Sequence, residues 1–140
     1  MNQFDGERFI GRFRRGLRIE PKIRLRMSDD DPELERLLKY MRARGSQSIE
    51  EDGAFVISIR SDIEVPLCVW YEECAHVLQV MRDGVVPLSC EDNGASDNEA
   101  EIARCLLERN ARRRGPKLDV ADEAHYREIL NRWRDRHDSA

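Results

Sequence analysis

A glutamate and a histidine four residues apart, Glu72 and His76, have the spacing in this chain that points most directly to chemistry. On an α-helix, residues at i and i+4 lie one turn apart on the same face. A carboxylate oxygen and an imidazole nitrogen held there can bind a divalent metal ion together. Glu73 adds a carboxylate that could accept a proton from a metal-bound water. The same pair also occurs by chance on ordinary amphipathic helices, so both interpretations stay open.

The apolar residues around this pair predict the helix that must carry it, over residues 66–83. One side of that helix is apolar and is formed by Leu67, Trp70, Tyr71, Cys74, Leu78 and Met81. The other side carries a polar line formed by Glu72, His76, Gln79 and Asp83. Val69 and Val80 flank the polar line, so we expect it to be partly buried.

The next predicted helix offers a third ligand. It begins with Ser96 and Glu99 in the spacing of a capping box and runs to about Arg114. Glu99 projects to the apolar side of this helix, where an inward-facing carboxylate could complete a zinc site. Alternatively, Glu99 reaches back to the backbone N–H of Ser96 and binds no metal. The sequence leaves both interpretations open.

Two strands and two further helices complete the predicted elements. Alternating side chains predict strands over 22–27 and 54–60. Asp31-Pro32 predicts the start of a helix that ends at Gly45. A last helix is capped by Asp119 or Asp122.

These elements predict an α+β fold, a small sheet of two to three strands with about four packed helices. Residues 1–21 are expected to form a basic extension or a short helix that is partly mobile. Residues 22–140 are expected to form a single domain. A polar loop is expected at 91–95.

Composition limits the classes of protein to which the chain could belong. Charged residues make up 37% and hydrophobic residues 40% of the chain, as in a folded domain with a charged surface. We find no apolar run of about 18 residues, so we expect no membrane span. We also find no signal peptide and expect a cytoplasmic protein, with export only by a route that reads no such peptide. The four cysteines match no zinc ribbon, so we expect them to be reduced and structural.

The chain has a basic N-terminal segment, with eight arginines and lysines between residues 7 and 26. The net charge is nevertheless −4, and few aromatic residues are interleaved with the basic ones. We therefore expect internal charge pairing rather than nucleic-acid binding.

Two segments carry a resemblance to a known family. They are Glu72-Glu73-Cys74-Ala75-His76-Val77-Leu78-Gln79 and Asn98-Glu99-Ala100-Glu101-Ile102-Ala103. Over residues 54–135 the chain resembles the zincin-like metallopeptidase domains found at the ends of bacterial polymorphic toxins. Glutamate stands where that family has the first histidine of His-Glu-x-x-His. The resemblance implies a zincin-like minimal core, with Glu72 and His76 as Zn²⁺ ligands, Glu73 as general base, and Glu99 or Glu101 as third ligand.

The function expected from these observations is that of a zinc-dependent hydrolase. The resemblance implies a peptidase with a protein or peptide substrate, in the setting of an interbacterial effector. The alternative is a non-catalytic protein-binding module, an inhibitor or immunity-type partner that keeps the helices. In that case the acidic residues in 29–35 and 91–101 would form its binding surface.

Overall fold

The computed structural model describes residues 1–84 and 96–138, so the polar loop expected at 91–95 lies outside the described residues. The chain divides into two compact units, residues 1–77 and 78–140. The boundary falls inside one helix, α3 (Leu67–Asp83). The described residues contain a three-stranded mixed sheet and five α-helices, which confirms the α+β fold class.

The sheet belongs to the first unit and has the order β1-β3-β2. The central strand β3 (Phe55–Ile59) pairs parallel with β1 (Ile23–Met27), and all five of its residues are buried. Both strands lie where the alternating side chains predicted them. On its other side β3 pairs antiparallel with β2 (Gly45–Ile49).

Strand β2 was not anticipated from the sequence, and the helix predicted to extend to Gly45 ends earlier. That helix is α2 (Pro32–Tyr40), and Arg42 follows it with a φ of 54°. Most of β2 is glycine, serine and glutamine, which have little strand preference, so its conformation depends on pairing with β3. A Cβ at Gly45 would lie 3.0 Å from Ile59 and 3.2 Å from Val69, so the strand approaches its neighbours closely there.

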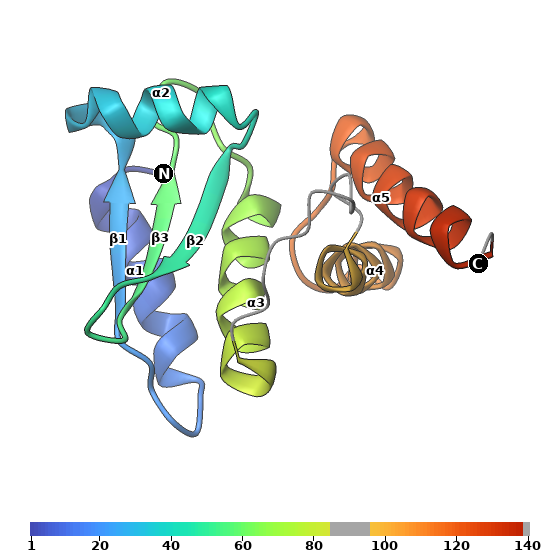
Figure 1. The fold of residues 1–140 in the computed structure, drawn as a ribbon, viewed down its shortest axis with the longest axis horizontal. Coiled ribbons are helices and arrows are strands. Elements are labelled where there is room, and N and C mark those ends of the chain that lie inside the picture. The colour runs from blue at the N-terminus through green and yellow to red at the C-terminus, as the bar shows by residue number, and fades with distance from the viewer. Residues whose placement is uncertain (85–95, 139–140) are drawn as a thin grey trace. The chain divides into compact units, whose positions relative to one another are not determined.

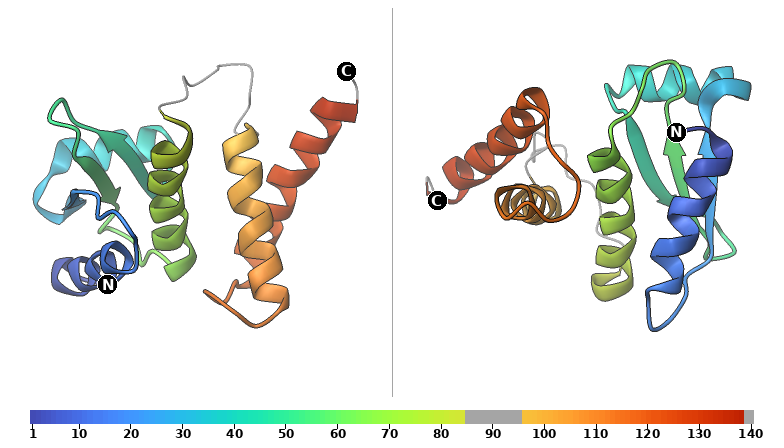
Figure 2. Two further views of the ribbon diagram at one scale, coloured as in Figure 1. Left: turned by 90° about the horizontal axis from the view of Figure 1, so that it is seen from below. Right: turned by 180° about the vertical axis from the view of Figure 1, so that it is seen from behind.

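Two helices lie against one face of this sheet, as Figures 1 and 2 show. They are α1 (Gln3–Arg15) and the part of α3 that belongs to the first unit. Gly6 of α1 lies directly against Leu25 of β1 and Trp70 of α3. Helix α2 lies across the ends of the strands (Figure 1). For residues 1–21, a short helix was one of the two expected forms, and α1 buries Gly6 and Ile10.

The second unit contains a helical hairpin of α4 (Asp97–Ala111) and α5 (Val120–Asp138). Trp133 Nε1 donates to Asp97 Oδ1 at 2.8 Å, so the end of α5 lies beside the start of α4. Of the two caps predicted for α5, Asp119 and Asp122, it is the Asp119 carboxylate that accepts from a backbone N–H, that of Asp122, at 2.7 Å. Helix α4 ends three residues before the predicted Arg114, and Gly115 makes the following turn with a φ of 80°.

The core of this hairpin comes from both helices. Its buried apolar residues are Ala100, Ile102, Ala103, Leu106, Tyr126, Ile129 and Leu130. Within residues 1–84 and 96–138, none of the helices has the length and apolarity needed to cross a bilayer.

Candidate metal centre

Helix α3 carries the residues singled out for chemistry and confirms the helix predicted over 66–83. Its buried positions include Cys68, Val69, Trp70, Cys74 and Val77, all at most 3% exposed. These residues fix how far the helix is turned about its axis, because burying a side chain stabilises it by about 1.5–3 kcal/mol. The polar line of the helix is therefore held in one orientation within the first unit.

Glu72 and His76 are brought together on that polar line. The ligand atoms that the carboxylate and the imidazole offer lie within 4.8 Å of each other. Both side chains are half-buried. Metal–ligand bonds of about 2.0–2.2 Å reach two atoms that lie up to about 4.4 Å apart, so an oxygen and a nitrogen within that range can bind the same divalent ion.

Glu73 follows Glu72 by about 100° around the helix and is 5% exposed. Its neighbour Cys74 reports the low-polarity surroundings, because burial, with the charge of Glu73 as a smaller cause, raises the pKa of that thiol to about 12. A carboxylate in such surroundings is poorly hydrated, and poor hydration strengthens its interaction with a proton donor. Glu73 is therefore a buried carboxylate next to the Glu72–His76 pair in the sequence.

Gln79, one turn after His76, links the end of α3 to the start of α4 in the second unit. It is 4% exposed, and its Nε2 donates to the backbone oxygen of Asn98 and to Glu101 Oε1, both at 2.9 Å. Arg82 adds an ion pair with Glu101 at 3.0 Å. Gln79 was predicted to lie on the polar line of this helix, but no role was predicted for it. The signal that could have revealed one was a long amide at a position between two flanking valines.

Glu101 is thus already engaged by two side chains. The hydrogen bond from Arg82, followed by that from Gln79, holds the pKa of Glu101 below its ordinary value. The carboxylate stays charged, but its oxygens are used in these bonds. Glu101 therefore serves to join α3 to α4.

Glu99 lies in the first turn of α4 in the second unit and is half-buried. Its backbone N–H donates to Ser96 Oγ at 3.2 Å, which is the first half of the expected capping box. This bond uses the backbone of Glu99 and not its carboxylate. The side chain is therefore compatible with either role considered for it.

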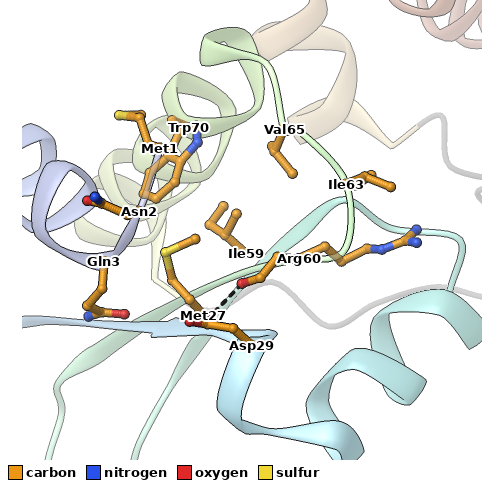
Figure 3. Close-up of a pocket in the computed structure, with 11 residues that line it drawn as sticks. Met1, Asn2, Gln3, Met27, Asp29, Ile59, Arg60, Ile63, Val65 and Trp70 are labelled. Atoms are coloured by element: carbon orange, nitrogen blue, oxygen red, sulfur yellow. Dashed lines mark hydrogen bonds between the residues drawn. The ribbon is translucent and has the colours of Figure 1, made fainter.

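The first unit also contains a cavity of about 260 Å³ at the ends of β1 and β3, shown in Figure 3. Its walls include Met27, Ile59, Val65 and Trp70. Trp70 is about 160° around α3 from Glu72, so this cavity lies on the other side of the helix from the Glu72–His76 pair. Its two charged side chains are already engaged, because Arg60 pairs with Asp62 and Asp29 accepts from Ser61 in the same wall.

Comparison of the chain with protein-family models, with curated proteins and with solved structures gave no match.

Proposed function

We propose that this chain is a metal-dependent hydrolase that acts on peptide bonds, with Zn²⁺ as its metal. The observation that carries the proposal is the Glu72–His76 pair, half-buried with ligand atoms within 4.8 Å. A helix that holds an oxygen and a nitrogen ligand one turn apart supplies two of the three protein ligands of a catalytic zinc site.

The third ligand we propose is Glu99. Glu99 lies in the first turn of α4 and is half-buried, as Glu72 and His76 are on α3. Glu101, the other glutamate considered, has its carboxylate bonded to Arg82 and Gln79. The backbone oxygen of Asn98, the residue before Glu99, accepts from Gln79, which lies one turn after His76 on α3.

The metal, when bound, supplies Lewis-acid chemistry that makes a water molecule easier to deprotonate. Glu73 would accept the proton of the attacking water and deliver it to the leaving nitrogen of the peptide. Glu72 contributes a negative charge where a histidine ligand is neutral, so the water should be less acidic and the reaction should be faster at higher pH.

Metal content is the first test of this proposal. The purified chain should bind about one Zn²⁺ with three protein ligands. Glu72→Ala, His76→Ala and Glu99→Ala should each lose that metal, measured by elemental analysis after dialysis. His125→Ala and Glu108→Ala are matched controls on α5 and α4, both exposed, and should retain it. A parent chain without metal, or equal loss in the controls, overturns the site.

Activity is tested separately with Glu73→Gln, which keeps the shape of the side chain. This variant should bind zinc like the parent but hydrolyse a fluorescently labelled casein at least about 100-fold more slowly, the scale of a general base. Equal rates in the parent and in Glu73→Gln would contradict the role of Glu73. A metal-bound parent that leaves casein and a mixed peptide library intact would contradict the hydrolase.

A protein-binding module is a second candidate, favoured by one observation on α2. Leu37 and Tyr40 on this helix, and Met41 just after it, are 52%, 87% and 48% exposed. Exposed aromatic and apolar side chains of this kind form the centres of protein interfaces. A partner that binds the parent and Glu73→Gln, but not Tyr40→Asp, would support this function. Binding that survives Tyr40→Asp and Leu37→Asp would exclude this surface.

A further inference from the structure

The outer side of α1 carries a row of arginines that is separate from the candidate metal centre. Helix α1 turns Gly6 and Ile10 inward, and the Phe9 ring packs on Trp70 and Tyr71. At about 100° per residue, three arginines fall within a narrow stripe on the opposite side. These are Arg8, Arg12 and Arg15, which are exposed, and exposed Arg18 follows shortly after the helix. We call these four residues the arginine row.

No carboxylate neutralises the arginine row within residues 1–84 and 96–138. Other arginines of the first unit differ in this respect: Arg24 pairs with Asp52, Arg26 with Asp31, and Arg60 with Asp62. The internal pairing expected from the sequence therefore forms for these three arginines but not for the row. An unpaired row of guanidinium groups on an acidic protein attracts anions locally.

The chemistry of the row favours phosphate groups on a chain. A guanidinium group donates two parallel hydrogen bonds to a phosphate, and arginines one turn apart can contact successive phosphates. Phe4 is 66% exposed and lies beside Arg8, whose guanidinium is 5.8 Å from its ring centroid. An exposed aromatic ring next to an arginine offers a face on which an unpaired base can stack.

A membrane surface fits the same helix less well. An amphipathic helix binds a bilayer by inserting its apolar side between the lipids. In α1 that side is occupied, because Ile10 is 4% exposed and Gly6 lies against Trp70 and Leu25. The exposed residues of α1 are Gln3, Phe4, Asp5, Glu7 and three arginines, and the arginines bind phosphate groups without insertion.

We infer that the arginine row binds the phosphate backbone of a single-stranded nucleic acid without sequence preference. Such binding is dominated by release of counterions, so it weakens with salt by a slope of about 0.7 per phosphate contacted. Three or four contacts predict a slope of about −2 to −3 in log affinity against log salt. The affinity should be in the range of about 1–100 μM near physiological salt and tighter below it.

The test measures fluorescence anisotropy of a labelled oligothymidylate of about 15 nucleotides, between about 50 and 200 mM salt. The triple variant Arg8→Gln, Arg12→Gln, Arg15→Gln should lose at least about 10-fold in affinity and most of the salt slope. All three residues are exposed, so its thermal unfolding should match that of the parent. Arg127→Gln, Arg132→Gln, Arg134→Gln on α5 changes the net charge equally and should bind like the parent.

Three outcomes of the oligonucleotide measurement overturn the inference. They are no binding by the parent at low salt, an equal loss in the α5 variant, and a salt slope that is unchanged in the α1 variant. Vesicles of phosphatidylserine and phosphatidylcholine form a second arm of the experiment. Binding of the parent to these vesicles but not to the oligonucleotide would assign the row to a lipid surface and also overturn the inference.

Discussion

The ring of Phe9 on α1 meets the ring of Trp70 on α3 edge to face, with centroids 6.0 Å apart and planes at 71°. Trp70 is 1% exposed and lies two residues before Glu72. Because the contact holds α3 against α1, it fixes the side of α3 that remains for Glu72 and His76. The N-terminal helix thus supports the candidate metal centre without contributing a residue to it.

Gly6, beside this contact, should not tolerate a side chain. A Cβ at Gly6 would lie 2.6 Å from Trp70 Cη2 and 2.7 Å from Leu25 Cδ2, which is closer than van der Waals contact allows. Gly6→Ala should therefore destabilise the chain by about 1–3 kcal/mol despite the better helix propensity of alanine. Urea unfolding measures the change.

Gly11→Ala, on the same helix, is the matched control. Its Cβ would meet only the flexible end of Arg15, at 3.0 Å, so alanine should stabilise the chain by about 0.5–1 kcal/mol. Equal effects of the two substitutions would show that α1 does not pack as described.

The cysteines should differ in reactivity. Cys68 is fully buried, and burial raises the pKa of Cys74 to about 12, whereas Cys105 is exposed. The thiolate is the reactive form, so iodoacetamide at neutral pH should label Cys105 and spare Cys68 and Cys74. Peptide mapping by mass spectrometry after a short reaction measures this. Rapid labelling of Cys74 in the folded chain would contradict its buried position.

The sequence predicted elements whose signals are local. The period of the apolar residues predicted α3, and Ser96 marked the start of α4, where its Oγ accepts from the backbone N–H of Glu99. The Glu72–His76 pair followed from helical pitch alone. Such features depend on neighbours a few residues away, so the sequence alone is enough to predict them.

What the sequence could not predict depends on distant partners. Strand β2 takes its conformation from β3, and the bond from Gln79 to Glu101 joins residues 22 positions apart. The arginine row is also a result of the fold, since Arg24 found acidic partners in Glu50 and Asp52 while Arg8 and Arg12 did not. Charge counts along a chain do not say which charges meet.

Acid should weaken the pairing of Arg24 with Asp52. Hydrogen bonds from Arg24, followed by the backbone N–H of Ala54, lower the pKa of Asp52 to about 2. A lowered pKa stabilises the folded chain above the unfolded pKa of about 4, and this stabilisation is lost as pH falls towards 2. Asp52→Asn should therefore destabilise the chain at pH 6 and have a smaller effect near pH 2.

Arg24→Gln provides the second arm of this measurement. If the pair acts as a unit, the double variant should be less destabilised at pH 6 than the sum of the single variants. Chemical unfolding of the four proteins at both pH values measures the coupling. Additive effects at pH 6 would show that the ion pair contributes nothing measurable.

Gln79→Ala tests whether the end of α3 positions the proposed metal centre. The buried amide bonds Asn98 and Glu101, so its loss should destabilise the chain by about 1–3 kcal/mol. Zinc affinity, measured by competition with a chelating dye, should fall by about 10–100-fold, as for residues that orient metal ligands. Arg82→Gln removes an exposed ion pair from the same Glu101 and should destabilise the chain less than Gln79→Ala. If Gln79→Ala loses stability but binds zinc like the parent, then Gln79 stabilises the chain without positioning the metal ligands.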